Sequence, residues 1–322
     1  MTFISMDEEI LPPSDDYIFK AVMTHPNSKA ALMDLISAVI GRTVTDVQIR
    51  NNELPVTDTD EKNERLDLNC TIDSGDQINV EMQGSRIEEI TDGHENFINR
   101  TVYYMTDLHS SQKSKGMKYY ELVRTFQVTF SMFTVYPDYP GYINSANLRR
   151  PDGELVSDQI NMIIIELSKL GDVLKKPLDD MTPLDMWSAF LGYAADPKYR
   201  RLINELIVRK EAIGMASSVL TAISKDEHER AKFLSRRKAE TDLVSNILTA
   251  EERGRREGRA VGKAEGIAEG IAVGKAEGIA VGKAEGIAEA DAKWQSIVVD
   301  KDAALAEKDE IIKELLSQLN PN

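Results

Sequence analysis

Residues 65–83 read RLDLNCTIDSGDQINVEMQ, two runs of alternating apolar and polar residues around a short polar turn. Alternation with a period of two is typical of β-strands, and two such runs joined by a turn predict a β-hairpin. One face of the hairpin is apolar and includes Cys70. The other face carries acidic and amide side chains, among them Asp67, Glu81 and Gln83, because residues two apart in a strand point the same way.

The turn determines which residues of the two strands face each other. A three-residue loop at positions 74–76 sets Asp67 opposite Gln83. It also sets Asn69 opposite Glu81. Asp67 and Glu81 are then diagonal neighbours, roughly 7–8 Å apart, and carboxylates at this reach can share a divalent cation. A solvated polar face of a one-sided sheet shows the same alternation, so the periodicity leaves both interpretations open.

The charge balance of the chain is acidic. Its 322 residues include 39 Lys and Arg against 54 Asp and Glu, which gives a net charge of −15. A nucleic-acid-binding protein normally carries a basic surface, so any contact with DNA must be local or must depend on metal ions. The chain has one cysteine, Cys70, which excludes a disulfide framework and is expected to be a buried structural thiol.

The sequence carries no signal for export or membrane insertion. The segment MTFISMDEEI at residues 1–10 is acidic and lacks a positive region followed by a long apolar run. No stretch reaches the roughly 18 consecutive apolar residues of a membrane span. We therefore expect a cytoplasmic protein without a membrane partner.

The order of the predicted elements indicates an α/β fold with a mixed central sheet flanked by helices. Strand-like and helical patterns follow one another at first, whereas strand signals vanish between residue 175 and about 250. We predict a first helix that has its N-cap among residues 14–16 and ends near Met23, and further helices over 28–40 (with Gly41 as the C-cap), 86–112 and 119–122. Strands are predicted over 44–49, 126–135 and 162–167 besides the hairpin.

Four regions follow from this pattern. We predict a core over 1–170, a helical domain over 171–250, a glycine-repeat segment over 251–292 and an amphipathic or coiled-coil tail over 293–322.

Glycine occurs at every fourth position from Gly254 to Gly286. A repeat of four suits a helix, but each glycine costs about 0.5–1 kcal/mol relative to alanine, so an isolated helix is not expected. Either the segment is flexible, or the small residues let helices approach closely. The tail adds Val298, Leu305, Ile312 and Leu319 at a spacing of seven. Together they predict a homo-oligomer, with a flexible linker and a frayed helix as the alternative.

The sequence lacks the motifs that several other kinds of catalytic or binding site require. Gly262-Lys263 is followed by Ala264 where a phosphate-binding loop needs Ser or Thr. The four histidines show no zinc-site spacing, and no GxSxG motif is present. A metal ion held by carboxylates is therefore the remaining candidate for the chemistry of this protein.

Three segments together resemble a known family. They are DDYIFK at 15–20, RLDLNC at 65–70 and VEMQ at 80–83. They resemble the Rpn family of recombination-promoting nucleases and transposases, which belongs to the PD-(D/E)XK nuclease superfamily. The Arg100-x-x-Tyr103-Tyr104 helix, IIIELSKL at 163–170, the helical region with Trp187 and the glycine-repeat tail are similar to that family as well. The resemblance implies a restriction-endonuclease-like core.

The resemblance also implies site residues on the hairpin. Asp67 resembles the family's central aspartate and Glu81 the acid of its E-x-K pair, so these two would hold Mg²⁺ or Mn²⁺. Gln83 occupies the lysine position, as in the family's own E-x-Q variant. Since Gln83 can donate a hydrogen bond but has no charge, a positive contribution is missing there.

Further residues of the family pattern lie outside the hairpin. Asp16 matches the aspartate of the early DxxFK motif and would supply an upstream acid, and Lys20 closes that motif. Lys20 or Arg100 would replace the missing charge, with Tyr103 as a further supporting residue. The resemblance thus implies a Mg²⁺-dependent deoxyribonuclease that acts on DNA in recombination, mobility or defence. The alternative is a catalytically weak or silent nuclease-fold protein that acts in DNA binding or assembly.

Overall fold

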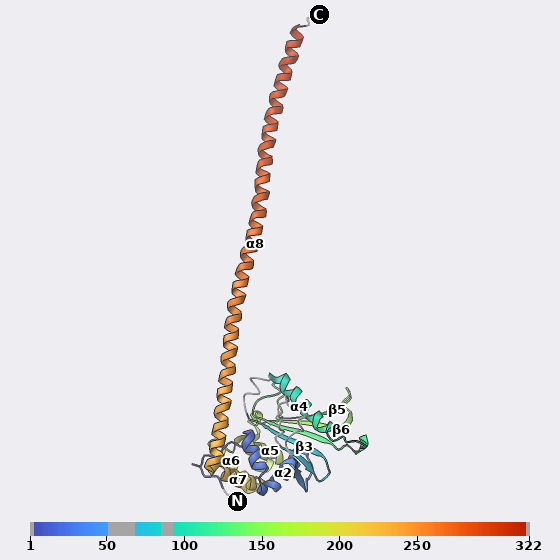
Figure 1. Ribbon diagram of the computed structural model, residues 1–322, viewed down its shortest axis with the longest axis vertical. Helices are drawn as coiled ribbons and strands as arrows, with labels where there is room; N and C mark the ends of the chain where they lie inside the picture. Colours follow the sequence, from blue (N-terminus) through green and yellow to red (C-terminus); the bar gives the residue numbers. More distant parts are fainter. Residues whose placement is uncertain (1–2, 51–67, 85–92, 320–322) are drawn as a thin grey trace. The chain divides into compact units, whose positions relative to one another are not determined.

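A mixed sheet forms the centre of the first part of the chain. The computed structural model describes residues 3–50, 68–84 and 93–319, and the chain divides into two units, residues 1–247 and 248–322. In the described part the sheet has six strands in the order β1-β2-β3-β4-β6-β5 (Figure 1). Strands β3, β4 and β6 are parallel, and the remaining neighbours are antiparallel. The strands are β1 (Val47–Ile49), β2 (Asn69–Ile72), β3 (Gln77–Gln83), β4 (Thr125–Ser131), β5 (Ile143–Arg149) and β6 (Leu155–Glu166).

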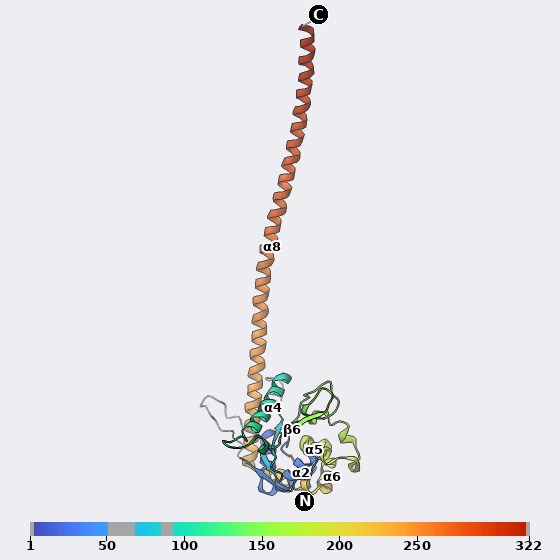
Figure 2. The ribbon, with the colours of Figure 1, turned by 90° about the vertical axis from the view of Figure 1, so that its right-hand side faces the viewer.

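One face of the sheet packs on most of the helices. Figures 1 and 2 show α2, α5 and α6 on this side, opposite to α4. Burying a large apolar side chain contributes about 1.5–3 kcal/mol, so this shared core is the main source of stability. Burial raises the pKa of Cys70, which lies on this face, to about 12, as expected for a structural thiol. The helices are α1 (Asp16–Met23), α2 (Lys29–Ile40), α5 (Pro183–Tyr193), α6 (Arg200–Arg209) and α7 (Glu211–Lys225). The strand side chains buried in this core are Val47, Cys70, Ile72, Ile78, Val80, Met82, Phe126, Val128, Phe130, Ile163 and Ile165.

The opposite face of the sheet is polar, yet it is buried. Helix α4 (Gly93–Ser110) covers it, and Phe97 packs there with Val135 and Ile164. The polar side chains beneath α4 include Asn79, Glu81, Thr125, Gln127, Thr129 and Ser131, all at most 4% exposed. The interpretation of the hairpin's polar face as a solvated surface is therefore wrong for its described residues.

The pairing of β2 with β3 corrects the predicted register. Asn69 faces Asn79 rather than Glu81. Gly75 adopts a left-handed conformation with φ of 84°, and its N–H donates to the Ile72 carbonyl at 2.8 Å. Because glycine fits the left-handed third position of a three-residue loop, the loop is 73–75 instead of 74–76. The shift is two residues, so every described side chain of the hairpin keeps its predicted face. Asp67 lies outside the described residues.

The first helices agree with the sequence prediction. Asp15 is the N-cap of α1, and its carboxylate accepts from the backbone N–H groups of Tyr17 and Ile18 at 3.1 and 3.2 Å. Helix α2 ends at Gly41, whose φ of 71° is the left-handed C-cap conformation. The predicted turn of helix at 119–122 is a 3₁₀ helix. The 3₁₀ helices are Pro26–Ser28, Tyr119–Glu121, Leu167–Lys169, Val173–Lys175, Leu178–Asp180 and Pro197–Tyr199.

Three strand predictions are wrong in extent, and one strand was not predicted. The predicted 44–49 strand begins only at Val47. The predicted 126–135 strand ends at Ser131, where the Ser131 hydroxyl accepts from the N–H of Phe133 at 3.2 Å and the chain turns. Strand β6 begins at Leu155, seven residues before its predicted start. Its antiparallel partner β5 reads INSANLR and lies at the sheet edge, half-buried or exposed. Neither β5 nor the first seven residues of β6 show the alternation of apolar and polar residues by which a buried strand is identified from sequence.

The glycine repeat is helical. Helix α8 (Glu227–Leu319) runs through all nine glycines without a break, so the flexible alternative and the expectation that the repeat would not form an isolated helix are wrong. Close packing of a second helix on the glycines stays a prediction. Every side chain described in the second unit is exposed. None of the helices in the described part has an apolar stretch long enough to cross a lipid bilayer.

Candidate active site

A buried carboxylate stands at the middle of the polar face. Glu81 lies on β3 beneath α4 and is 4% exposed. The Asn79 amide donates to Glu81 Oε1 at 2.9 Å and to Gln127 Oε1 at 3.0 Å. Burial raises the pKa of Glu81, against the opposing effects of the Arg100 charge and of hydrogen bonds from neighbouring amides. A carboxylate in such a place is costly to keep ionised unless a cation or donors compensate it.

The structure brings Gln83 and Arg100 to this carboxylate. Arg100 Nη2 donates to Gln83 Oε1 at 3.4 Å, and its guanidinium lies 5.7 Å from the centre of the Phe97 ring. Gln83 also forms a hydrogen bond that lowers the pKa of Glu81. Arg100 therefore places a positive charge beside the position where the motif has glutamine instead of lysine.

Oxygen atoms around Glu81 suit a hard metal ion. Thr129 pairs with Glu81 across the β3–β4 ladder on the same face. The side-chain oxygens Asn79 Oδ1 and Thr129 Oγ1 are buried and have no hydrogen-bond partner among the described residues. Carboxylate, amide and hydroxyl oxygens are the ligands that Mg²⁺ prefers. No group of three His, Cys, Asp or Glu side chains in the described part is arranged to hold a metal, so the described residues offer part of a site.

The early DxxFK motif has a different neighbour. Asp16 forms an ion pair with Arg236 of α8, at 3.0 Å between Oδ2 and Nη2, and the Tyr17 hydroxyl bonds to Glu229 of the same helix. Burial, followed by the charges of Asp15 and Asp16, raises the pKa of Glu240 one turn further along. Asp16 makes no hydrogen bond or ion pair with Glu81, so this prediction gains no support from the described contacts. Lys20 lies half-buried on α1.

Gly84 directly follows the last residue of β3 and was not among the predicted site residues. A Cβ atom at Gly84 would lie 2.0 Å from the carbonyl oxygen of Ser14. The chain that leaves Gln83 therefore packs directly on the start of α1. Its position directly after VEMQ was the available signal.

Gly84→Ala is expected to destabilise the protein by about 1–3 kcal/mol, because the backbone of Ser14 must move to admit the methyl group. Thermal unfolding would measure this loss. Gly171→Ala is the matched control, since nothing lies within 4 Å of that added Cβ atom. Equal stability of the two variants would contradict the close approach.

The structure also describes the surroundings of two other residues of the family pattern. Tyr103 is 57% exposed on α4 and packs edge-on against Tyr104. Glu166, within the IIIELSKL segment, is fully buried at the end of β6 and was not predicted as a polar anchor. Its carboxylate accepts from the N–H of Val135 at 2.8 Å, and Lys169 Nζ lies 2.9 Å away. Glu166 therefore holds the chain that follows β4.

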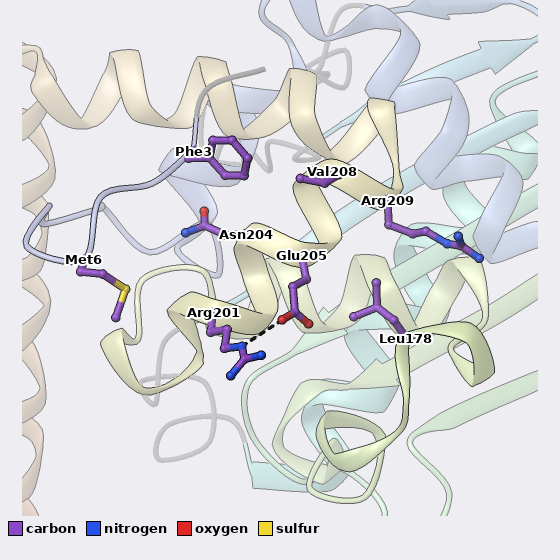
Figure 3. A pocket seen from close by; sticks show the side chains of 8 residues that line it. All are labelled: Phe3, Met6, Leu178, Arg201, Asn204, Glu205, Val208 and Arg209. Atoms are coloured by element: carbon purple, nitrogen blue, oxygen red, sulfur yellow. Dashed lines mark hydrogen bonds and ion pairs between the residues drawn. The ribbon is translucent and has the colours of Figure 1, made fainter.

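An open hollow lies elsewhere, between the N-terminal arm and α6. It encloses about 660 Å³, and Figure 3 shows Phe3 and Met6 of the arm facing α6, where Arg201 pairs with Glu205. None of the predicted site residues lines it. Its lining is largely apolar and it has no buried carboxylate, so the chemistry points to the Glu81 group instead.

Comparison with known proteins covers most of the chain. The family model described as PD-(D/E)XK nuclease family transposase matches residues 13–250. This range includes α1, the whole sheet and α4, and therefore the Glu81 group. Comparison with curated proteins and with solved structures gave no match.

Proposed function

Because the chain belongs to the PD-(D/E)XK nuclease family of transposases, we propose that it is a metal-dependent DNA endonuclease that acts in recombination, mobility or defence. The observation that carries this function is the buried Glu81 carboxylate, which meets Gln83 and Arg100 under α4. A nuclease needs such a group to hold a cation at the scissile phosphate. We place its action on DNA in the cytoplasm.

We assign Mg²⁺ or Mn²⁺ to Asp67 and Glu81. The part of Asp67 rests on the strand alternation and on the family resemblance, since that residue lies outside the described ranges. The free oxygens of Asn79 and Thr129 beside Glu81 fit the same ion. When bound, a divalent cation polarises the phosphate and lowers the pKa of an attacking water.

The protein side chains would orient the reactants. Arg100 donates to Gln83 Oε1, which leaves the Gln83 amide group to donate toward Glu81. In this arrangement Gln83 positions a water or a phosphate oxygen, and Arg100 provides the charge that a motif lysine would carry. Asp16 and Lys20 remain proposed contributors from α1.

Plasmid cleavage tests this function. Purified protein with supercoiled DNA should produce nicked or linear product in Mg²⁺ or Mn²⁺ and none in EDTA, because the carboxylates need the cation to act on phosphate. Binding of DNA without cleavage in any divalent metal would instead support the silent alternative, which Gln83 motivates. Absence of both would exclude a nucleic-acid role.

We also propose that the chain self-associates through its C-terminal region. Large apolar side chains of α8 are exposed, among them Ile279 at 62% and Leu305 at 58%. Nine glycines weaken a lone helix by about 0.5–1 kcal/mol each, and close packing against a second copy would offset that cost. Light scattering should therefore report more subunits for the full chain than for residues 1–247. Equal subunit numbers would contradict this.

A further inference from the structure

A short segment of α8 is basic, although the chain as a whole is acidic. Positions 253–263 hold five basic residues and one acidic residue, Glu257, whereas the whole chain has a net charge of −15. Four of the five are arginine, whose planar guanidinium matches phosphate oxygens in a two-point contact. The basic residues are Arg253, Arg255, Arg256, Arg259 and Lys263.

Helical geometry gathers four of these residues on one face. Arg255, Arg259 and Lys263 follow one another at intervals of four, and Arg256 lies next to them. At about 100° per residue they occupy an arc of roughly 100°, with Glu257 on the far side. We call Arg255, Arg256, Arg259 and Lys263 the basic stripe. It is about 12 Å long, which corresponds to three or four phosphates of one DNA strand at about 3.4 Å each.

The basic stripe has no partner within the described part of the chain. All four side chains are exposed, and none forms an ion pair or hydrogen bond with a described residue. Three basic residues nearer the start of the same helix differ, because they form ion pairs with acidic residues. Those pairs are Arg230–Glu9, Lys232–Glu229 and Arg236–Asp16, at 2.6, 2.9 and 3.0 Å.

The spacing within the stripe does not serve the helix itself. A solvated helix face gains stability from opposite charges four residues apart. Here Arg255 and Arg259 repel each other at that spacing, as do Arg259 and Lys263, and each pair costs roughly 0.2–0.5 kcal/mol. Glu251 and Glu252 lie four residues before Arg255 and Arg256 and offset this cost for the helix as a whole. The repulsion within the stripe itself would be relieved by anions bound along its face.

We propose that the basic stripe binds the sugar–phosphate backbone of duplex DNA, independently of base sequence. The choice of DNA as occupant rests on the proposed nuclease function and on charge complementarity, since closely spaced phosphates are the complement of four aligned cations. The stripe supplies the local basic contact that an acidic nuclease needs to retain its substrate. It is an auxiliary binding surface, separate in the sequence from the Glu81 group.

The test compares two charge-matched variants of the full-length protein. One carries Arg255→Gln, Arg256→Gln, Arg259→Gln and Lys263→Gln. The other carries Lys275→Gln, Lys283→Gln, Lys293→Gln and Lys301→Gln, which removes the same charge from exposed sites further along α8. Glutamine is a good helix former, and circular dichroism would verify the helix content of both. Binding of a fluorescent duplex of about 30 base pairs, long enough to span the stripe several times over, is measured by anisotropy in EDTA, which prevents cleavage.

The stripe variant should bind the duplex at least about tenfold more weakly than wild type at low salt. The slope of log affinity against log salt concentration should also be smaller in magnitude, by about one for each phosphate that the variant no longer neutralises. The control variant should bind like wild type. Equal binding by wild type and the stripe variant would overturn the proposal, as would equal weakening of both variants. A change in subunit number with unchanged DNA affinity would also overturn it and would identify an acidic protein surface as the partner.

The outcome is separable from that of the nuclease function. If the protein binds DNA through the basic stripe but never cleaves it, the endonuclease proposal is overturned and the proposal for the stripe stands. If wild type cleaves plasmid but the stripe variant binds the duplex as well as wild type does, the endonuclease proposal stands and the proposal for the stripe is overturned.

Discussion

Glu81→Gln should reduce plasmid cleavage by about 10²–10³-fold while the protein remains folded. The substitution keeps the shape of the side chain and its hydrogen bond with Asn79, but it removes the charge that would hold the cation. Loss of metal-ion catalysis is worth several kcal/mol, and each 1.36 kcal/mol is about tenfold in rate. Initial rates of nicking in Mg²⁺ would measure the effect. Cleavage at the wild-type rate would show that Glu81 is not the metal-binding acid.

The same substitution should stabilise the metal-free protein at neutral pH. Burial raises the pKa of Glu81 above its ordinary value, so the folded state favours the protonated form. The stability that this form contributes is present below the ordinary carboxyl pKa and is lost as the pH rises through the raised value. Wild type should therefore unfold more easily than Glu81→Gln at about pH 7 in EDTA, and the difference should vanish at acid pH.

Chemical denaturation at several pH values would measure this difference. Glu289→Gln, at an exposed position of α8, is the control and should match wild type throughout. Added Mg²⁺ should stabilise wild type more than Glu81→Gln, because only wild type keeps the charged ligand. A pH-independent difference between Glu81→Gln and wild type would contradict the assignment of the raised pKa.

Arg100→Gln should reduce cleavage by about 10²-fold, because removing one preorganised positive group from a reacting phosphate costs this much. Arg100 is the charge that lies beside Gln83 and the Glu81 carboxylate. A second substitution, Gln83→Lys, in the Arg100→Gln background should recover part of the rate by returning the charge to the motif position. Cleavage kinetics of wild type, the single variant and the double variant provide the comparison.

Folding effects can be separated from chemistry in this series. Arg100 also lies over the Phe97 ring, so its replacement removes a packing interaction as well as a charge. Arg100→Lys keeps the charge and should retain more activity than Arg100→Gln, even when both unfold at the same temperature. A double variant as inactive as Arg100→Gln alone would show that Arg100 does more than replace a lysine.

Local sequence was sufficient for much of the fold. The N-cap candidates at 14–16 and the C-cap Gly41 predicted where α1 begins and where α2 ends, because capping depends on a few neighbouring backbone groups. The register of the hairpin was equally local, but it followed from the left-handed conformation of Gly75, which the alternation does not reveal. Strand β5 could not be predicted, because an exposed edge strand is held by backbone hydrogen bonds to β6 rather than by an apolar face.

In the candidate site, too, some features follow from local sequence and others only from contacts between distant parts of the chain. Alternation with a period of two placed Glu81 and Gln83 on one face, and the family resemblance added Arg100 as a source of charge. The resemblance gave no sign that Asp16 would pair with Arg236, 220 positions along the chain. Glu166 was missed as an anchor because its partners come from three separate segments of the chain.

The residues of the hairpin thus specify which side chains share a face, since that depends only on the geometry of an extended backbone. Whether this face is exposed to solvent depends on helix α4, which follows β3 in the chain, packs on this face and buries it. That burial turns an ordinary glutamate into a carboxylate with a raised pKa beside Arg100. Desolvation is a property of everything packed around a group, so the tertiary structure decided it and the hairpin sequence could not.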